Sequence, residues 1–348
     1  MAKTRNPPKK ILIVRTDRLG DVILSTPVIS VLRKNFPHAH IGFLCRPYTY
    51  EAVNRNPYLD EVIVYDKYGK QKSLLSTIKF AFFIRRKHFD WSIILHPTNR
   101  AHLISFIAGI PFRVGWDRKM GFLLSKRLPH VKQDGLKHES EFNLDILRSL
   151  SLTVEDTCLH FPLSHEAEKQ ISIILSNLKI EDGSKFVVIH PSASCPSKRW
   201  PQDNYSELVK MLQKKSNLKI IIITVKGEEG FGKLIVENNE VVDLRGKLTI
   251  VQTASLLKKA ALFISNDSGP VHIAAAIGTP VISIFGRKDP GLSPLRWKPL
   301  GKNSYYIHKD AGCSECLAHN CKKGFLCLKK IAPQEVAILA LGILNKFN

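Results

Sequence analysis

Residues 10–21 of this 348-residue chain read KILIVRTDRLGD, and this stretch decides the fold class. The segment 10–15 (KILIVR) is short and mainly apolar, which predicts a buried strand. A polar turn follows at residues 16–20, and a helical stretch then runs to about Phe36, with Pro27 either at a kink or in the true first turn. A strand, a turn and a helix in this order indicate a βαβ unit.

The same alternation continues along the chain. Strand-like segments lie at residues 41–45, 61–65, 91–95, 186–190, 220–224, 262–265 and 281–285, and helix-like segments at 73–87, 204–215, 249–260 and 271–277. This pattern predicts an α/β protein with two Rossmann-like domains that face each other across a cleft. Ligands of such sheets bind beyond the carboxyl ends of the strands.

The place where the pattern restarts, near residue 185, sets the predicted domain boundary. Residues 163–183 predict an amphipathic helix with a polar exit, so we place the linker around 178–184. The expected domains are residues 1–178 and 179–331. Residues 332–348 predict a capped amphipathic helix, which we expect to pack back on the first domain.

Composition excludes several classes of protein. Hydrophobic residues make up 44% of the chain and charged residues 24%, which excludes a disordered chain and a collagen-like fibre. No apolar run approaches the roughly 18–20 residues of a membrane span, and no secretory signal is recognisable, so we expect a cytosolic protein. The net charge of +22 favours nucleic acid, an anionic membrane or a phosphorylated substrate as partner; the alternative is a generally basic surface.

The turn after the first strand bears on cofactor and catalysis. A dinucleotide-binding domain carries G-x-G-x-x-G here, but this turn has Gly20 alone, which argues against NAD or FAD; we expect no cofactor. The turn instead offers Asp17 and Asp21 at the end of the strand. Asp21 is either a general base that faces the cleft or a cap of the following helix.

Candidates for nucleotide binding lie in the second predicted domain. Ser268 or Gly269, followed by Pro270, opens a helix whose N-terminus attracts anions; the alternative is an ordinary capped turn. The pair Glu228–Glu229 follows another strand and either accepts from a ribose hydroxyl or is an exposed loop acid.

The segment after the strand at 186–190 carries two hydroxyls and two cations: Ser192, Ser194, Lys198 and Arg199. These groups suit a leaving diphosphate, and the alternative for the two cations is a solvated basic turn. No D-x-D pair occurs in the chain. Its absence favours neutralising the diphosphate with lysine and a helix N-terminus, so we expect no catalytic metal.

Cysteines are scattered in the first two thirds of the chain and clustered near its end. The cluster consists of four residues: Cys313, Cys316, Cys321 and Cys327. Because no export signal is present, disulfides are not expected. Four thiols so close together form either a structural metal site or a compact loop with free thiols or adventitious disulfides.

Three long stretches together resemble one family. They are ILIVRTDRLGDVILSTPVISVLRKNFP at 11–37, HPSASCPSKRW at 190–200 and ISNDSGPVHIAAAIGTPVISIFG at 264–286. They are similar, in this order, to the ADP-heptose:lipopolysaccharide heptosyltransferases (glycosyltransferase family 9), and the resemblance covers nearly the whole chain. It implies a GT-B fold, with an acceptor-binding N-terminal domain and a nucleotide-sugar-binding C-terminal domain.

The resemblance also implies roles for individual residues. The aspartate of the family's G-D-V motif falls on Asp21, which would be the catalytic base, and a nucleoside-contacting glutamate falls on Glu229. The groups that would hold the donor diphosphate fall on Lys198, on Ser192 or Ser194, and on the D-[TS]-G-x-x-H residues Asp267, Ser268, Gly269 and His272.

The activity that the resemblance implies is inverting transfer of a heptose from ADP-heptose to the inner core of lipopolysaccharide. The acceptor would be an anionic lipid A–core glycolipid, so we expect a peripheral protein on the inner face of the inner membrane, with no nucleic acid partner. Two other functions stay open. A GT-B-fold sugar-nucleotide epimerase would act without an acceptor, and a basic non-catalytic protein would bind nucleic acid in a salt-sensitive way.

Overall fold

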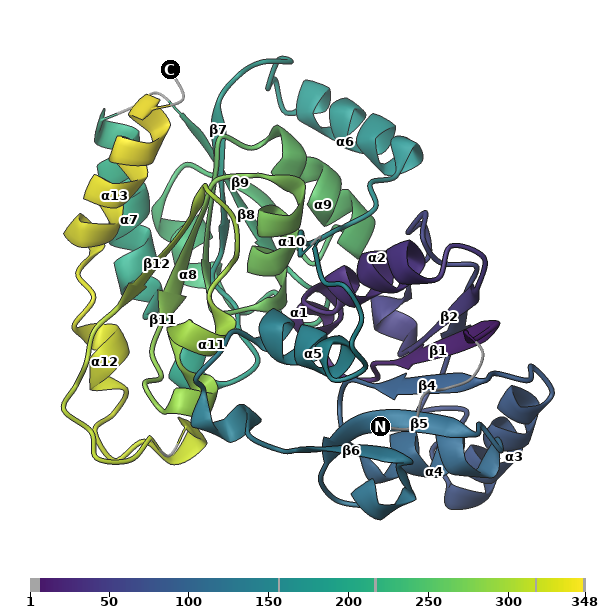
Figure 1. Cartoon of the computed structure of the whole chain (residues 1–348). Helices are drawn as coiled ribbons and strands as arrows, with labels where there is room; N and C mark the ends of the chain where they lie inside the picture. Colours follow the sequence, from purple (N-terminus) through teal and green to yellow (C-terminus); the bar gives the residue numbers. More distant parts are fainter. Residues whose placement is uncertain (1–6, 156, 216–217, 317, 347–348) are drawn as a thin grey trace. The chain divides into compact units, whose positions relative to one another are not determined.

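The computed structural model describes residues 7–155, 157–215, 218–316 and 318–346, which form two compact units (Figure 1). The first unit runs to Pro162, and the second runs from Leu163 and also takes in residues 134–136. Each unit contains one six-stranded parallel sheet with helices packed around it.

The first sheet has the strand order β3-β2-β1-β4-β5-β6, and all its neighbours are parallel. Its strands are β1 (Lys10–Val14), β2 (His40–Cys45), β3 (Glu61–Val64), β4 (Trp91–Ile94), β5 (Phe112–Asp117) and β6 (Lys126–Pro129). Strand β1 is central because its apolar residues are buried on both faces, with Ile11 paired to Ile41 on one side and to Trp91 on the other.

The helices of the first unit are α1 (Leu19–Ile23), α2 (Thr26–Asn35), α3 (Leu74–Arg85), α4 (Asn99–Ile107) and α5 (Glu139–Arg148). The structure resolves the two readings of Pro27, since α1 ends before it and α2 begins with this proline in its first turn. Helix α3 begins after Ser73, whose side chain accepts a hydrogen bond from the backbone N–H of Ser76.

The second sheet has the order β12-β11-β10-β7-β8-β9 and is also entirely parallel. Its strands are β7 (Phe186–His190), β8 (Lys219–Thr224), β9 (Val242–Arg245), β10 (Leu262–Asn266), β11 (Val281–Phe285) and β12 (Ser304–His308). The helices of this unit are α6 (His165–Asn177), α7 (Gln202–Lys215), α8 (Lys233–Asn238), α9 (Ile250–Lys259), α10 (Gly269–Ile277), α11 (Pro294–Trp297), α12 (Leu326–Lys329) and α13 (Pro333–Lys346).

The two sheets share one topology. When the strands of the second unit are counted from β7, their order is the same 3-2-1-4-5-6 as in the first, which is the doubly wound order of Rossmann-like folds. The strand order reverses direction between β1 and β4 in one unit and between β7 and β10 in the other. These two switch points are where the fold places ligands, beyond the carboxyl ends of the strands.

The unit boundary and the terminal helix differ from what the sequence predicts. The units divide between Pro162 and Leu163 rather than near 178, because α6 packs against α9 of the second unit. The terminal helix, which we expected on the first domain, belongs to the second unit. Helix α13 lies beside α7, and Val336, Ala340 and Ile343 belong to the core of the second unit (Figure 1).

Candidate functional site

A buried arginine organises the switch point of the first unit. Arg15 follows β1 directly, its side chain is 1% exposed, and it reaches both acids of the turn. Its Nε donates to Asp17 Oδ1 at 2.9 Å, and its Nη2 donates to Asp21 Oδ1 at 2.7 Å. Such charge-assisted hydrogen bonds fix the direction in which the carboxylates point.

Asp21 is not the cap of the helix that contains it. The N-cap of α1 is Arg18, and Asp21 lies in the first turn, where the positive end of the helix dipole favours its negative charge. The exposed fraction of its side chain is 15%. One of its oxygens therefore bonds to Arg15 while the carboxylate still has access to solvent, as a general base requires.

The other side of Arg15 is held by α5, more than a hundred residues further along the chain. Glu139 accepts from Arg15 Nη1 at 3.1 Å and from Lys132 Nζ at 2.7 Å, and Asn143 accepts from both cations at 3.1 Å. The side chains of Arg15, Lys132 and Glu139 are nearly inaccessible to solvent. The switch point is thus an interlocked set of buried charges.

Two titratable groups beside this set have shifted pKa values. Burial raises the pKa of Asp17 to about 7, although Arg15 opposes the shift. Burial also lowers the pKa of His96 to about 3, and the positive charges of Arg15 and Lys132 lower it further. His96 Nδ1 lies 3.4 Å from Asp17 Oδ2. At neutral pH the histidine is therefore uncharged.

At the switch point of the second unit, two cations share one buried carboxylate. Lys198 Nζ lies 2.8 Å from Asp267 Oδ2, and Arg287 Nη2 lies 3.1 Å from the same oxygen. Burial alone would raise the pKa of Asp267, but Lys198 and Arg287 outweigh it and hold the pKa below its ordinary value. Because one carboxylate offsets one of the two positive charges, the cluster keeps a net positive charge.

The first turn of α10 lies directly after this carboxylate. Its N-cap is Ser268, whose side chain makes no capping hydrogen bond, so that side chain does not occupy the amides that begin the helix. Gly269 is the first helical residue, and His272 is buried one turn further on. A small first residue and the positive end of a helix together suit an approaching phosphate.

Hydroxyl and imidazole groups connect the ends of β7 and β10. His190 Nε2 lies 3.0 Å from Ser192 Oγ, and His190 Nδ1 lies 3.1 Å from Ser265 Oγ. Ser192 Oγ also donates to Glu228 Oε2 at 2.6 Å. Burial lowers the pKa of His190 to about 4, so its ring is neutral and pairs with hydroxyls rather than with acids.

The remaining candidates are more exposed. Ser194 lies on the surface, whereas Ser192 is buried. Glu229 is also exposed, and it accepts a hydrogen bond from the backbone N–H of Gly227 that lowers its pKa. Of the acidic pair, Glu228 is therefore the residue that the structure joins to the serine loop. Of the clustered cysteines, Cys313, Cys316 and Cys321 lie in the segment between β12 and α12, and Cys327 lies in α12.

Sequence reasoning missed Arg15, Glu139 and Arg287 as site residues. A signal existed for Arg15, because a cation that follows four buried apolar residues is costly unless acids meet it. No local pattern identifies Glu139 or Arg287, since each reaches its site through the order of the strands. Among the described residues, Arg287 Nε is buried without a hydrogen-bond partner, which indicates room for an acceptor that the chain itself does not supply.

Two Rossmann-like units in one chain, each with polar groups at its own switch point, are typical of the GT-B class of glycosyltransferases. A glycosyl transferase family 9 structure from Veillonella parvula has a TM-score of 0.87 to this chain at 25% identity, covering 97% of this chain and 98% of that one. The fold of Escherichia coli ADP-heptose lps heptosyltransferase II is also the same, with a TM-score of 0.79 at 22% identity and coverages of 97% and 99%.

The sequence gives the family. Residues 78–326 match glycosyltransferase family 9 (heptosyltransferase), and the chain belongs to this family. Lipopolysaccharide heptosyltransferase 3 of Escherichia coli K12 is 28% identical over 300 residues, which cover 82% of this chain and 83% of that protein. The predicted GT-B fold and the predicted family are both confirmed.

Proposed function

We propose that this protein transfers a heptose from ADP-heptose to the core of lipopolysaccharide with inversion at the anomeric carbon. The observation that carries the proposal is the pair Lys198 and Arg287 on Asp267, at the beginning of α10. Relatives named as lipopolysaccharide heptosyltransferases 2 and 3 support the choice of sugar and acceptor.

Departure of the diphosphate is the step that the second unit assists. Negative charge grows on the leaving ADP as the glycosidic carbon separates from it. Lys198, Arg287 and the first amides of α10 stabilise that charge, because they are fixed in place before the reaction begins. Asp267 orients the two cations rather than reacting, since both of them hold it in its ionised form.

Binding of the nucleoside and the phosphates involves the remaining polar groups of the second unit. Glu229, next to Glu228 in the same turn, accepts from a ribose hydroxyl. Ser192 and the exposed Ser194 donate to phosphate oxygens, and Ser268 and His272 complete the diphosphate site on α10.

Activation of the acceptor is the step that the first unit performs. Asp21 removes the proton from the acceptor hydroxyl, and that oxygen attacks the anomeric carbon on the face opposite the diphosphate. Arg15 holds the carboxylate in one orientation, and Glu139 and Asn143 hold Arg15. A single displacement with one base inverts the anomeric centre.

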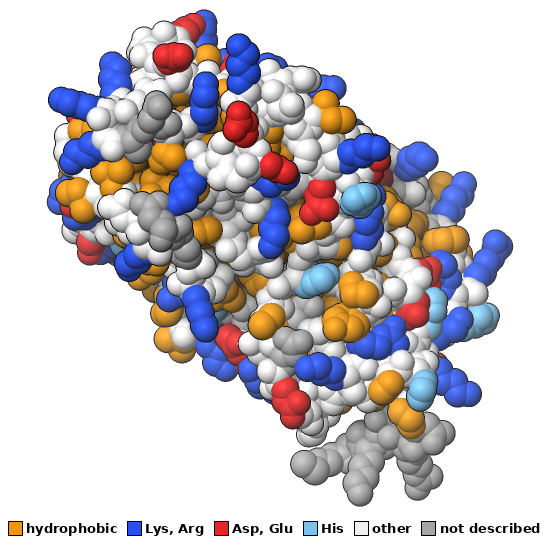
Figure 2. Space-filling model, turned by 90° about the horizontal axis from the view of Figure 1, so that it is seen from above, with side chains coloured by type: hydrophobic (Ala, Val, Ile, Leu, Met, Phe, Trp, Pro, Cys, Tyr) orange, Lys and Arg blue, Asp and Glu red, His pale blue; other side chains and the backbone are white. Residues whose placement is uncertain are grey.

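The lipid-linked acceptor explains the basic surface. Figure 2 shows Lys and Arg side chains spread over the face in view. Helix α3 also exposes four large apolar side chains beside the exposed Arg85 and Arg86: Leu74, Leu75, Phe82 and Phe83. No helix among the described residues is long and apolar enough to cross a membrane. We propose that α3 docks peripherally on anionic lipid.

Paired substitutions test the reaction. With ADP-heptose and heptose-deficient lipopolysaccharide core, we expect Asp21→Asn to lower the rate on the order of 10²–10⁴-fold while ADP binding persists. Lys198→Ala should lower the rate on the order of 10²–10³-fold and weaken ADP binding as well. The exposed controls Asp182→Asn and Lys233→Ala should leave both unchanged. Near-normal turnover of Asp21→Asn would contradict the assignment of Asp21 as the general base.

An assay without acceptor separates the proposal from an epimerase. Transfer predicts no conversion of the nucleotide-sugar until acceptor is added, whereas epimerisation proceeds without it. Co-sedimentation with vesicles tests the membrane part: binding should require anionic lipid, fall with salt and fall in a Phe82→Ser/Phe83→Ser variant. Binding that ignores both lipid charge and salt would contradict it.

A further inference from the structure

An arginine stacks on two tyrosines at the carboxyl edge of the first sheet. Arg46 directly follows β2, and its guanidinium carbon lies 4.5 Å from the ring centroid of Tyr48 and 4.6 Å from that of Tyr68. Tyr48 belongs to the short helical turn Pro47–Ala52, and Tyr68 belongs to the loop after β3. Tyr48 is 40% exposed and Tyr68 is 66% exposed, so this arginine–tyrosine stack lies on the surface of the unit.

The arginine–tyrosine stack lies next to the turn that carries the proposed base. The hydroxyl of Tyr48 donates to the backbone carbonyl oxygen of Asp17 at 3.1 Å, and the helical turn at 47–52 contacts α1, which contains Asp21. Burial raises the pKa of Tyr48 to about 12; the negative charges of Asp17 and Asp21 raise it further, and Arg46 opposes the shift. A sugar whose hydroxyl reaches Asp21 therefore meets the stack with another part of the same molecule.

Hydrogen bonds from outside the loop hold Tyr68 in place. Arg100 of α4 donates to the carbonyl oxygen of Lys67 at 3.0 Å and to that of Gln71 at 3.1 Å. Lys67 Nζ donates to the carbonyl oxygen of Thr16 at 3.0 Å and lies 5.2 Å from the centroid of the Tyr68 ring. The loop is thus tied to α4 and to the turn after β1, so that little conformational freedom is lost when a ligand binds there.

The guanidinium of Arg46 has donors that the protein does not use. A guanidinium carries five N–H donors in a planar fork and has no acceptor. Within residues 7–155, 157–215, 218–316 and 318–346, no side chain or backbone group accepts a hydrogen bond from Arg46 or forms an ion pair with it. Stacking on the rings leaves the edge of the guanidinium available, and such a fork binds a carboxylate or a phosphate through two parallel hydrogen bonds.

We propose that Arg46, held by Tyr48 and Tyr68, is a specificity-determining residue that receives an oxyanion of the acceptor sugar, either a carboxylate or a phosphate. This assignment rests on the proposed transfer reaction. Lys67, whose ammonium group is fixed beside Tyr68, adds positive charge at the same place. An acceptor without the oxyanion would leave the forked donors without their partner, and Arg46 therefore discriminates between charged and uncharged acceptors.

Kinetics with a soluble acceptor test this residue. The acceptor is heptose-deficient core oligosaccharide from which the acyl chains have been removed, so that docking on lipid does not contribute. Arg46→Gln should raise the KM for this acceptor about 10–100-fold while kcat and ADP affinity keep their wild-type values, because only binding of the acceptor is weakened. Arg46→Lys should have an intermediate KM, since it keeps the charge and loses the fork. Arg55→Gln, at an exposed arginine of the same unit, is the control and should have wild-type kinetics.

Chemically altered acceptors identify the oxyanion. In one preparation the carboxylates are converted to methyl amides, and in another the phosphates are removed. The kcat/KM of the wild-type protein should fall about 10–100-fold with one of the two, and Arg46→Gln should treat that preparation and the unaltered acceptor alike. Tyr68→Leu should raise the KM several-fold because the arginine loses its support, and Tyr68→Phe, which keeps the ring, should recover most of this loss.

Failure of this assignment and failure of the transfer reaction give different results. An unchanged acceptor KM in Arg46→Gln, or a wild-type protein that accepts both altered preparations normally, would overturn the role of Arg46 and leave the transfer reaction intact. The second of these results needs no variant and does not depend on how a variant folds. No transfer by the wild-type protein to the unaltered acceptor would overturn the proposed function, and the role of Arg46 with it.

Discussion

The two switch points have the same strand order and opposite chemistry. In the first unit, three acids and two cations interlock in a mostly buried cluster: Asp17, Asp21, Glu139, Arg15 and Lys132. In the second unit, a neutral histidine and two serines join the strand ends, and one carboxylate holds two cations. The topology fixes where ligands bind, and the residues that follow each strand fix what is bound.

The difference matches the two halves of glycosyl transfer. Proton removal needs a carboxylate whose position does not vary, and a cluster of opposite buried charges supplies that rigidity. Stabilising a leaving diphosphate needs excess positive charge, which the sharing of one carboxylate by two cations supplies.

Stability should depend most on the buried ion cluster of the first unit. Glu139→Gln leaves Arg15 and Lys132 buried with one negative charge fewer, and we expect the free energy of unfolding to fall by about 3–5 kcal/mol. Chemical denaturation measures this loss in the free energy of unfolding. Glu141→Gln, in the exposed pair with Arg148, is the control and should cost less than about 1 kcal/mol. Equal losses in both variants would show that the cluster is not structural.

The neutral histidine of the second unit should make stability depend on pH. The folded pKa of His190 is about 4 and its ordinary value is 6.5, so the unfolded state binds more protons between these values. Its contribution is complete above pH 6.5 and is lost as pH falls toward 4, by up to about 3 kcal/mol.

His190→Gln should remove this contribution, which unfolding curves measured between pH 4 and 7 will detect. A neutral amide keeps a polar partner for Ser192 and has no proton to gain. His38→Gln, at an exposed position, is the matched control and should keep the wild-type slope. If the free energy of unfolding of His190→Gln varied with pH as it does in the wild type, other groups would be responsible for the dependence.

Arginine at position 287 should matter for its shape as well as its charge. Arg287→Lys keeps the charge but loses the forked geometry and the buried Nε. We expect ADP affinity to fall about tenfold, or about 1.4 kcal/mol, by calorimetry. Arg55→Lys, at an exposed position of the first unit, should leave the affinity unchanged. Wild-type affinity in Arg287→Lys would place the phosphates elsewhere.

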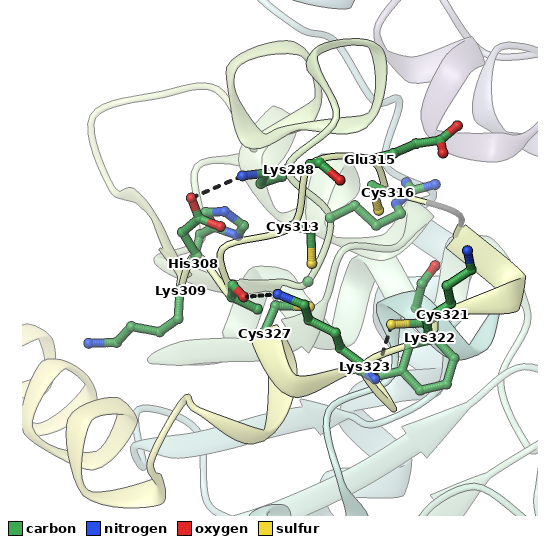
Figure 3. A pocket seen from close by; sticks show the side chains of 17 residues that line it. Lys288, His308, Lys309, Cys313, Glu315, Cys316, Cys321, Lys322, Lys323 and Cys327 are labelled. Carbon is green, nitrogen blue, oxygen red and sulfur yellow. Dashed lines mark hydrogen bonds and ion pairs between the residues drawn. The ribbon is translucent and has the colours of Figure 1, made fainter.

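The smallest expected effect is that of a chelator on transfer. Asp267, the carboxylate of the proposed donor site, is already bound by two cations, and the chain has no D-x-D pair. EDTA should therefore leave the initial rate unchanged. A slow loss of activity together with a lower melting temperature would instead indicate that EDTA had removed a structural metal from the clustered cysteines (Figure 3). Prompt loss that Mg²⁺ restores would contradict cationic neutralisation of the diphosphate.

The sequence predicts much of this fold because its central strands are buried on both faces. β1, β7, β10 and β11 appear as continuous apolar runs, and the helices after β10 and β11 begin at Gly269 and Pro294. The edge strands are harder to predict from the sequence. β6 (KRLP) and β9 (VDLR) are short and carry charges, so no periodicity marks them.

The site residues also differ in how readily the sequence predicts them. Asp21, Lys198 and Asp267 lie close to strand ends, where their motifs are visible. Glu139 and Arg287 act on partners that are distant in sequence, and a single sequence holds no record of such pairs. The sequence does not reveal the packing partner of the terminal helix for a related reason. An amphipathic pattern shows that α13 needs an apolar partner, but does not show which one.

Because α13 belongs to the second unit, this unit is nearly one continuous piece of chain. Apart from residues 134–136, everything in it follows Pro162. A single exchange of chain at Pro162 would therefore replace the second unit almost entirely without cutting through the core of either unit.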